Sequence, residues 1–424
     1  MTPAPDGYRT IEVPEARKGE LLAVDRLAFA FSPDPEVDDE VPLTLDWTRT
    51  MALEGTGGAL AGVHASYPFA LPVPGATVPC SGLTWVGVRP DHRRRGLLGS
   101  MIETHFERSG ARGEPVSALF AAEAPIYGRF GYGQAAENLR LTIARGAALR
   151  DVSGSADLDL RLESADAAAH SALVHAVHGA AGAGRPGWIE RNTDALRARH
   201  FADPRPWRDG AEQLRIVTVR AGDQVRGYAL FRRKEDWADG RPNGKVRIAE
   251  VAALDAAATH RLWSFLLDLD LTTTVKSPML AVDDALMQLL VDVRVDNAVI
   301  DDNLWVRLLD LPVALGARRY AAPTDVVLEV TDARLPANAG RWRVRTGTSG
   351  AADGGFGYDA EVSATSDPAD LTVDVRELGA AYLGGRSLAA MAGAGLVVEH
   401  RAGALLSASA AFGWPVAPLC TWGF

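Results

Sequence analysis

The stretch WVGVRPDHRRRGLLGSM, residues 85–101, constrains the fold of this chain more than any other. Trp85–Val88 is a short apolar strand, and the turn after it carries three arginines and a glycine before a helix with apolar periodicity. A helix that opens from such a turn presents unpaired backbone N–H groups at its positive end, which suits a phosphate or pyrophosphate. The spacing fits an ordinary strand-turn-helix with solvated arginines equally well, because short glycine motifs often occur by chance.

Composition narrows the class of protein. A chain of 424 residues should divide into two or three domains, since single cores rarely grow beyond about 250–300 residues. The net charge of −10 argues against general nucleic-acid binding. An acidic balance suits cationic substrates, although most acidic proteins use their charge only for solubility. With only two cysteines, Cys80 and Cys420, and no H-x-x-x-H or H-E-x-x-H pattern, we expect neither a disulfide framework nor a metal site.

The sequence also predicts where the protein resides. The first residues, MTPAPDGYRTIEV, lack the basic and apolar regions of a signal peptide, so secretion is not expected. No apolar run reaches the length of about 18 residues that a membrane span requires. We therefore expect a cytoplasmic protein.

Residues 1–150 are predicted to form one α/β domain. Short apolar runs alternate with glycine and proline before the arginine turn, which favours three antiparallel strands there. A strand after the intervening helix should run parallel to the third of them. The expected strands are Tyr8–Val13, Ala59–Val63, His64–Leu71, Leu83–Val88, Pro115–Phe120 and the closing strand Asn138–Ile143, and the expected helices are Ala16–Phe29, Leu45–Met51 and Ala124–Phe130.

Residues 151–312 repeat the same order of elements. Two strands around a Gly-Asp turn, RIVTVRAGDQVRGYALFRRK, precede a third strand, KVRIAEVAALD, and a helix at Ala256–Leu271. The second copy has Leu254-Asp255-Ala256-Ala257 where the first has its arginine and glycine turn. Backbone capture of a phosphate is therefore not expected there, and we interpret this domain as a degenerate structural repeat without a second active site.

Residues 313–424 are predicted to form an α+β unit. The runs VVLEVTD, RWRVRTG, GYDAEVSA and LTVDVRE alternate apolar and polar residues, as strands with one buried face do. The segments LGAAYLGGRSLAAMAGAG and ALLSASAAFGW then supply helices, and a short helix at Val313–Gly316 opens the unit.

The order of strands, R-x-x-G turn, helix, strand and short helix resembles the core of the GNAT acyltransferase superfamily. Arg93-Arg94-Arg95-Gly96-Leu97-Leu98 stands where that superfamily has its R/Q-x-x-G-x-G/A turn, although Leu98 departs from the usual final Gly or Ala. HRRRGLL together with PIYGRFGYG resembles the enhanced intracellular survival (Eis) family of actinobacterial acetyltransferases, whose turn is also R-R-G-L-L. The resemblance covers nearly the whole chain, and implies two tandem GNAT-like units, the second degenerate, followed by a sterol-carrier-protein-like C-terminal unit.

By position, the resemblance implies a site for acetyl-CoA that uses no metal. Tyr127 would be the general acid, and the C-terminal carboxylate of Phe424 the general base. The residues implied to bind acetyl-CoA lie on the strand, the turn and the neighbouring strand end: Val86, Gly87, Val88, Arg94, Arg95, Gly96, Leu97, Leu98, Gly99, Ala122 and Glu123. Without the resemblance, a tyrosine among glycines is more often a packed aromatic. The apolar end Cys420–Phe424, with no polar tail, favours a docked terminus.

The resemblance also implies a class of amine that accepts the acetyl group. Family members acetylate amines of aminoglycosides and of lysine-type side chains in an acidic, aromatic-lined pocket. The candidate aromatic walls here are Phe29, Phe31, Trp47 and Trp85. The loop FSPDPEVDDEVP would rim the pocket with Asp34, Glu36, Asp38, Asp39 and Glu40, unless these are only solvated loop charges. Gly423 replaces an acidic residue that some members have, which argues against strong polycation binding.

The sequence thus predicts an acetyl-CoA-dependent N-acetyltransferase that acts on a primary amine by direct attack in a ternary complex. One alternative is an acyltransferase for a specialised-metabolite amine or another acyl-CoA. The other is a non-catalytic protein that binds CoA or another ligand, which the sterol-carrier-like unit keeps open. The resemblance further implies a homo-hexamer built as a dimer of trimers.

Overall fold

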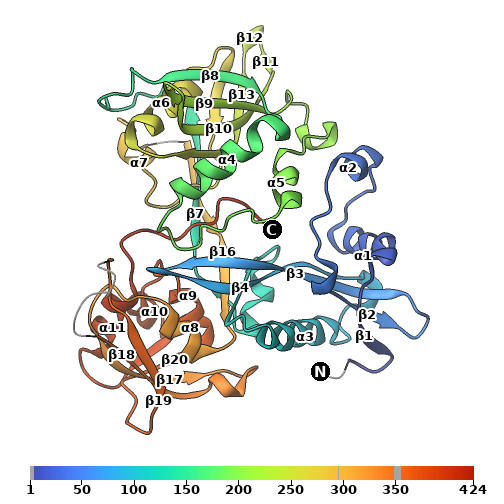
Figure 1. Cartoon of the computed structure of the whole chain (residues 1–424), viewed down its shortest axis with the longest axis vertical. Helices are drawn as coiled ribbons and strands as arrows, with labels where there is room; N and C mark the ends of the chain where they lie inside the picture. The colour runs from blue at the N-terminus through green and yellow to red at the C-terminus, as the bar shows by residue number, and fades with distance from the viewer. Residues whose placement is uncertain (1–3, 295, 348–354) are drawn as a thin grey trace.

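The computed structural model describes residues 4–294, 296–347 and 355–424, and three units follow one another along the chain (Figure 1). The first unit is a seven-stranded sheet in the order β1-β2-β3-β4-β5-β16-β6, with helices against it. Its strands are β1 (Tyr8–Glu12), β2 (Thr50–Gly55), β3 (Leu60–Val73), β4 (Ala76–Val88), β5 (Val116–Phe120), β6 (Gly133–Gln134) and β16 (Leu304–Leu308). Its helices are α1 (Lys18–Phe29), α2 (Pro35–Glu40) and α3 (Leu97–Ala111).

A long antiparallel hairpin of β3 and β4 forms the centre of this sheet. It turns at Gly75, whose φ of 66° lies in the left-handed region that glycine tolerates. The predicted strands Ala59–Val63 and His64–Leu71 are therefore one strand, β3, and not two. The predicted helix Leu45–Met51 is also wrong, because only a 3-10 turn at Trp47–Arg49 forms before β2 begins. A short apolar run does not distinguish a buried strand from a helix.

The second unit is built on another seven-stranded sheet, in the order β15-β7-β14-β13-β10-β9-β8. Its strands are β7 (Glu137–Ala144), β8 (Asp159–Ser164), β9 (Arg215–Ala221), β10 (Gln224–Lys234), β13 (Gly244–Ala253), β14 (Thr272–Lys276) and β15 (Asp296–Asp302), with a small hairpin of β11 (Trp237–Ala238) and β12 (Arg241–Pro242). Its helices are α4 (Ala167–Ala181), α5 (Asp194–Phe201), α6 (Ala256–Leu267) and α7 (Leu286–Leu289). The predicted strand pair and the helix after the third strand are confirmed, and α6 ends before residue 271.

Two strands are exchanged between the first and second units. β7, which was expected to close the first sheet, pairs instead with β14 and β15 in the second. In return β16, which follows the second unit in the chain, lies between β5 and β6 in the first sheet. Figure 1 shows β7 running between the two sheets, so the two units are joined by sheet hydrogen bonds as well as by the chain.

The third unit is α+β, as predicted. Its sheet has the order β19-β18-β17-β20-β21, formed by β17 (Asp325–Thr331), β18 (Gly340–Thr346), β19 (Ala360–Ala364), β20 (Leu371–Asp374) and β21 (Val397–Glu399). Its helices are α8 (Leu311–Ala317), α9 (Val375–Ala381), α10 (Leu388–Gly393) and α11 (Ala404–Phe412). Inside this unit the Arg318 guanidinium is fully buried over the rings of Tyr320 and Phe412, and donates to the backbone carbonyls of Ala381, Tyr382 and Phe412.

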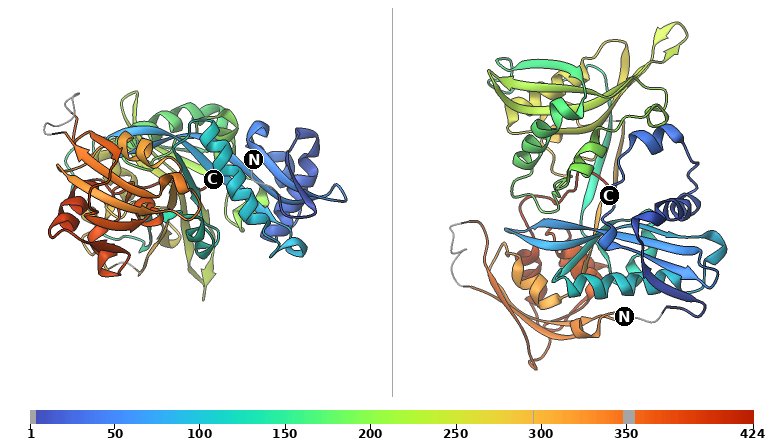
Figure 2. Two further views of the ribbon diagram at one scale, coloured as in Figure 1. Left: turned by 90° about the horizontal axis from the view of Figure 1, so that it is seen from below. Right: turned by 45° about the vertical axis from the view of Figure 1, so that its right-hand side comes forward.

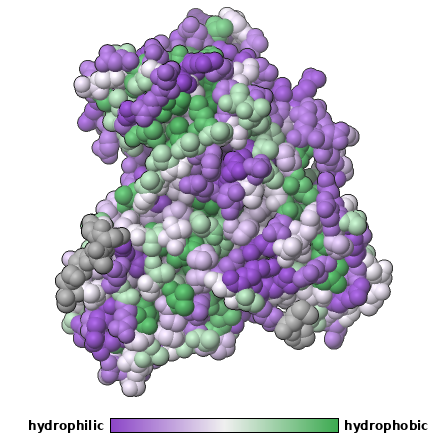
Figure 3. Space-filling model, viewed as in Figure 1, coloured by the Kyte–Doolittle hydropathy of each residue, from purple (hydrophilic) through white to green (hydrophobic). Residues whose placement is uncertain are grey.

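The first and third units share one hydrophobic core. Phe69 and Cys80 of the central hairpin belong to the same buried cluster as Leu328 of β17 and Phe412 of α11. After α11 the chain leaves the third unit, and its end lies where the first and second units meet (Figures 1 and 2). Polar residues cover much of the face drawn in Figure 3, with apolar patches between them. No helix within the described residues is long and apolar enough to cross a bilayer.

Candidate active site

The centre of the first sheet opens where β4 and β5 diverge. The two strands pair in parallel only from Cys80 to Gly82 on β4, after which β5 continues beside β16. β4 itself follows β3 as far as Val88, with a register shift near Trp85, whose φ of 54° is left-handed. Within the described residues, the edge of β4 beyond Gly82 that faces β5 therefore has no strand partner, and its backbone groups can pair with a ligand.

The arginine turn follows directly at the end of β4. Arg94 and Gly96 have φ values of 63° and 80°, and Gly96 caps α3 without a side-chain hydrogen bond. The first N–H groups of α3 thus remain available to an anion. A cavity of about 850 Å³ lies in front of this turn, and we call it the donor cavity. Its basic lining residues outnumber the single acid, Glu123: they are His92, Arg93, Arg94, Arg129 and Arg334.

Most of the residues predicted to bind acetyl-CoA line the donor cavity: Val86, Val88, Arg94, Gly96, Leu97, Leu98, Gly99, Ala122 and Glu123. Two do not. Gly87 is buried against α1, so close that a side chain there would meet Ala28. The Arg95 guanidinium donates to the hydroxyl of Tyr8 and to the carbonyl of Asp91, on the other side of the turn.

Tyr127 lies at the boundary between the donor cavity and a second cavity. The predicted helix Ala124–Phe130 is two 3-10 turns, and Tyr127 is the residue that joins them. Its side chain is 8% exposed and packs edge-on against Tyr132. Burial, with a further contribution from Glu123, raises the pKa of Tyr127 to about 12. The phenol is therefore protonated at neutral pH, and its residue lines both cavities.

The second cavity, of about 710 Å³, lies between the first and second units, and we call it the acceptor cavity. Phe29, Phe31 and Trp85 line it as predicted, and the two phenylalanine rings are stacked with centroids 5.8 Å apart. Trp47 does not line it. That side chain packs against the apolar core around Val24 and Val63, because the 3-10 turn that carries it leads into buried β2.

The acidic segment at residues 34–40 does not rim the acceptor cavity either. Asp34 caps α2, Asp38 pairs with Arg26, and Glu36 accepts a hydrogen bond from the backbone of Arg205. The cavity is lined instead by Asp25, Arg191, Arg199 and His200 together with aromatic side chains. Residues 34–40 are therefore not part of this cavity, and among the described residues Asp25 is the one acidic side chain of its lining.

The C-terminus is docked at the acceptor cavity. The Phe424 ring packs edge-on against Phe69 and Phe120, at centroid distances of 4.7 Å and 5.4 Å. Asn303 is fully buried, accepts from the backbone N–H of Cys420 at 2.8 Å and donates to its carbonyl at 3.0 Å. Trp422 donates to the carbonyl of Ile189. These contacts hold the last residues against β16 and the second unit, and Gly423 and Phe424 line the cavity.

Known proteins and protein families match all three units of the chain. Residues 9–135 and 187–308 each match the acetyltransferase (GNAT) domain, and residues 311–421 match the sterol carrier protein domain. An uncharacterized N-acetyltransferase of Streptomyces coelicolor is 41% identical over 405 residues, which are 94% of this chain and 95% of that protein. The N-acetyltransferase Eis of Mycobacterium tuberculosis is 32% identical over 350 residues, 80% of each chain. This chain is an Eis-family N-acetyltransferase.

A solved structure agrees with this family membership. The crystal structure of Eis1 from Mycobacterium abscessus superposes with a TM-score of 0.81 at 29% identity, covering 98% of this chain and all of that one (100%). A GCN5-related N-acetyltransferase from Kribbella flavida gives a TM-score of 0.73 at 25% identity over 98% of both chains. The three-unit fold of this Eis-family chain is thus shared along nearly its full length.

The second GNAT unit of this Eis-family chain has its own anion at the corresponding helix. Asp255 caps α6, and its carboxylate accepts from the backbone N–H of Ala258 at 2.9 Å. Arg226 pairs with the same carboxylate. A phosphate would have to displace this side chain, so the structure gives a physical reason for the predicted absence of a second donor site.

Sequence reasoning missed the basic residues that come from elsewhere in the chain. Arg334 follows β17 in the third unit, yet it lines the donor cavity and lies over the Phe130 ring at 5.2 Å, with Arg129 over the same ring at 5.1 Å. Arg199 reaches the acceptor cavity from α5. Arg129 could have been found, because it lies inside the PIYGRFGYG motif. The other two carry no local sequence signal.

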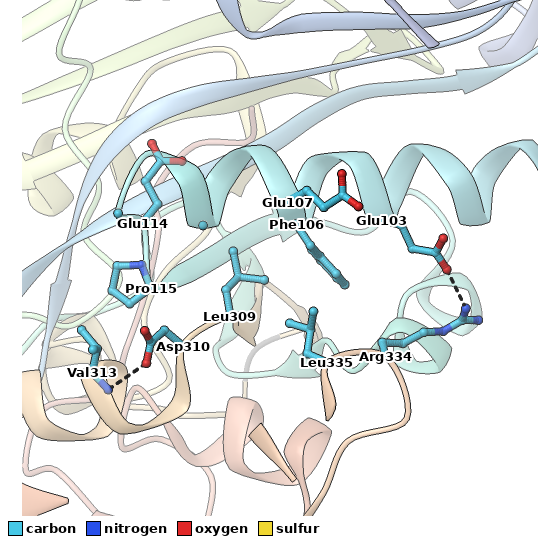
Figure 4. A pocket seen from close by; sticks show the side chains of 12 residues that line it. Glu103, Phe106, Glu107, Glu114, Pro115, Leu309, Asp310, Val313, Arg334 and Leu335 are labelled. Atoms are coloured by element: carbon cyan, nitrogen blue, oxygen red, sulfur yellow. Dashed lines mark hydrogen bonds and ion pairs between the residues drawn. The ribbon is translucent and has the colours of Figure 1, made fainter. Parts of the chain in front are cut away.

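A further cavity adjoins this site at Arg334, which lines both it and the donor cavity. It has a volume of about 510 Å³ and is enclosed between α3, the start of α8 and the segment after β17 (Figure 4). Phe106, Leu309 and Leu335 supply apolar walls, and Glu103 at its edge pairs with Arg334. None of the predicted site residues lines it. Among the described residues, no group of three or more His, Cys, Asp or Glu is placed to hold a metal ion.

Proposed function

We propose that this enzyme transfers the acetyl group of acetyl-CoA to a primary amine by direct attack in a ternary complex. The observation that carries the proposal is that Tyr127 lines both the donor and the acceptor cavity, while Phe424 ends in the second of them. Two substrates held in these cavities would approach each other at the tyrosine. GNAT acetyltransferases use acetyl-CoA, and the residue types of the donor cavity suit that donor.

The donor cavity offers each part of acetyl-CoA a complementary surface. The free edge of β4 at Val86–Val88 would pair with the amide groups of the pantetheine arm. The N–H groups at the start of α3 and the guanidinium of Arg94 would hold the pyrophosphate. Ala122 and Glu123, at the end of β5, would flank the thioester.

The proposed chemistry moves two protons. The neutral amine attacks the thioester carbonyl, the C–S bond breaks, and the thiolate takes a proton from the Tyr127 hydroxyl. The attacking nitrogen loses its own proton toward the Phe424 carboxylate, so that an amide and a free thiol leave. An α-carboxyl group with an ordinary pKa of about 3.5 is a weak base, and its attraction for the ammonium form of the acceptor adds to its proposed role.

The pKa of Tyr127 fixes the sign of the expected pH dependence. A phenol with a pKa of about 12 keeps its proton at all pH values below that. The general acid is therefore in its working form throughout the neutral range, and its ionisation does not reduce kcat between about pH 7 and pH 10. An acceptor amine loses its proton as pH rises, so kcat/KM for the amine should increase across the same range.

A thiol-release assay tests the proposal. Acetyl-CoA is offered with a panel of primary amines that includes an aminoglycoside, a lysine peptide and simple arylalkylamines, and free thiol is measured with the acetylated product. Turnover with at least one amine supports the proposal. Binding of CoA without thiol release for any amine would contradict it. Propionyl-CoA in a parallel series tests the alternative acyl donor.

Three finer expectations belong to the same proposal. The aminoglycoside and lysine-type amines of the family are the reference acceptors for this proposal, and we propose further that the protein is a homo-hexamer and that it is cytoplasmic. Light scattering coupled to size-exclusion chromatography measures the assembly, with a mass of about six chains as the supporting result. Cell fractionation measures the location.

A further inference from the structure

Arg199 is a cation inside the acceptor cavity with no paired carboxylate. It projects from α5 of the second unit, lies over the ring of Trp207 at 5.4 Å and donates to the carbonyl of Pro42 at 3.5 Å. Within the described residues it forms no ion pair, although Asp25 on the same lining interacts with it electrostatically. Burial lowers the pKa of its guanidinium, which indicates that water solvates this charge poorly. A guanidinium in such a place presents several N–H donors to whatever occupies the cavity.

The other basic side chains of the lining contact one buried carboxylate. Arg191 donates to the buried carboxylate of Glu250 at 2.8 Å, and the Nε2 of His200 lies 2.9 Å from the same carboxylate. Burial lowers the pKa of His200, so that imidazole is neutral at pH 7. Asp25 is the one acidic side chain in the lining, and burial raises its pKa to about 6. Arg199 is therefore the basic side chain of the lining whose N–H donors no carboxylate accepts directly, with Asp25 as its electrostatic neighbour.

The aromatic walls of the cavity define the rest of the ligand. The stacked rings of Phe29 and Phe31 are 37% and 62% exposed, and Trp207 is 43% exposed. Large aromatic side chains exposed beside a cavity gain free energy when a planar apolar group covers them. Tyr67 interacts electrostatically with Arg199, and its ring lies 6.3 Å from that of Phe424. Tyr67 therefore neighbours both the arginine and the last residue of the chain.

We infer that the acceptor is an aryl-containing amine that also carries an anionic group, which Arg199 binds while the amine is directed toward Tyr127 and the chain end. The inference rests on the proposed function, because it names the substrate class of the same cavity. A carboxylate would satisfy the guanidinium through two parallel hydrogen bonds. A polycation would place positive charge beside Arg199, so aminoglycosides should be poorer acceptors than an amine with an anionic group.

Four amines that differ at one position test this inference. 4-(Aminomethyl)benzoate, 4-(aminomethyl)benzamide, benzylamine and p-xylylenediamine share the ring and the reacting amine, and carry an anion, a neutral amide, nothing or a second cation opposite it. We expect kcat/KM for the benzoate to exceed that for the benzamide by about tenfold or more, and the diamine to be the poorest. Equal rates for the benzoate and the diamine would overturn the inference while leaving the proposed function intact.

Substitutions at Arg199 test whether this residue causes the preference for the anionic amine. Arg199→Ala should bring the ratio of benzoate to benzamide close to one, and Arg199→Lys should keep part of it because the charge remains without the planar fork. The matched control is Arg205→Ala, which removes an exposed arginine near the same cavity and should leave the ratio unchanged. An Arg199→Ala enzyme that keeps the full preference would assign anion recognition elsewhere and contradict the inference.

Binding provides a readout that does not depend on turnover. Trp85, Trp207 and Trp422 line the cavity, so its occupation should change the intrinsic fluorescence of the protein. Titration with 4-(aminomethyl)benzoate and with benzylamine gives two Kd values for the wild type and for Arg199→Ala. The expected result is tighter benzoate binding that the variant loses. If no amine is acetylated but this difference is present, the proposed function fails and the anion site stands. If the difference is absent, the inference fails.

Discussion

At the scale of single residues, Tyr127 is distinguished by its place in the structure, where it lines two cavities. A buried phenol with a raised pKa, lining two cavities at once, can donate a proton to a group arriving from either side. Its burial also makes it an ordinary packing residue, with Tyr132 against its ring. The two roles can be separated, because removing the hydroxyl leaves the ring in place.

Tyr127→Phe should lower kcat by about 100-fold or more and leave the affinity for CoA nearly unchanged. The aromatic packing is retained, so the free energy of unfolding should change little. The measurements are kcat by thiol release and Kd by calorimetry with CoA. Tyr320→Phe, far from both cavities in the third unit, serves as the control for loss of a buried hydroxyl. Equal loss of kcat in both variants would assign the effect to stability.

Gly96→Glu should abolish CoA binding. The residue has a φ of 80° and caps α3 at the edge of the donor cavity, so the substitution adds strain, bulk and negative charge where a pyrophosphate is expected. Gly58→Glu is the matched control, because Gly58 also has a φ of 80° but lies in an exposed hairpin with nothing near its side. Calorimetry with CoA should show binding only in the control, and binding by both would remove the turn from the donor site.

A site residue could be predicted from the sequence only where the motif that marks it is local. The RRRGLL turn follows from adjacent letters, because an anion-binding turn resides in one short segment, and the role proposed for Tyr127 in PIYGRFGYG follows from the family resemblance. Arg199 and Arg334 do not, because distant packing brings each to its cavity. Trp47 was assigned to the pocket by its residue type, but the backbone turns it toward the core.

At the scale of elements, the first turn of α6 contrasts with that of α3. One helix is capped by its own aspartate and the other by a glycine that leaves the N–H groups open. Asp255→Ala should therefore lower the free energy of unfolding by about 1 kcal/mol, through loss of the cap, and leave one CoA bound per chain. Urea unfolding and calorimetric stoichiometry measure the two quantities.

The control for that cap is Asp166→Ala, which removes the aspartate that caps α4 in the same unit through the N–H of Ala169. This substitution should lower the free energy of unfolding by a similar amount. A stoichiometry of two CoA molecules per chain, in the wild type or in the Asp255→Ala variant, would show that the second unit retains a donor site.

The segment after β17 carries a second element-scale prediction. Arg334 brings a positive charge from the third unit to the donor cavity, where it also pairs with Glu103. Arg334→Ala should raise KM for acetyl-CoA several-fold with a small change in kcat, and the effect should shrink as ionic strength increases. Arg341→Ala, an exposed arginine of the same unit that pairs with Glu329, should leave KM unchanged. An Arg334→Ala enzyme with an unaltered KM for acetyl-CoA would show that Arg334 does not contribute to acetyl-CoA binding.

Elements were predictable where periodicity was long and unambiguous. The helix after the arginine turn and four of the five strands of the third unit follow from apolar spacing alone, and β21 was not predicted. The short run at residues 45–51 does not, since its apolar residues fit a strand as well as a helix. Strand pairing across units leaves no periodic signal, so β7 was assigned to the sheet nearest to it in sequence.

At the scale of the whole molecule, the acceptor cavity is assembled from all three parts of the chain. α1 and β4 supply one side, α5 the other, and the last residues complete it. Appending a few residues after Phe424 should therefore lower kcat/KM for the amine by at least about tenfold, while CoA still binds. The same residues added before Met1 are the control. Full activity of the C-terminally extended enzyme would contradict the proposed role of the terminal carboxylate.

The exchange of β7 and β16 has a consequence for biosynthesis. As the chain leaves the ribosome, β5 is made long before β16, so the edge of β5 that β16 will cover is exposed while more than half of the remaining sequence is translated. The first sheet is incomplete until β16 is made, and we expect a fragment of residues 1–150 to keep an open sheet edge prone to aggregation. In this protein, the order of synthesis and the order of assembly differ.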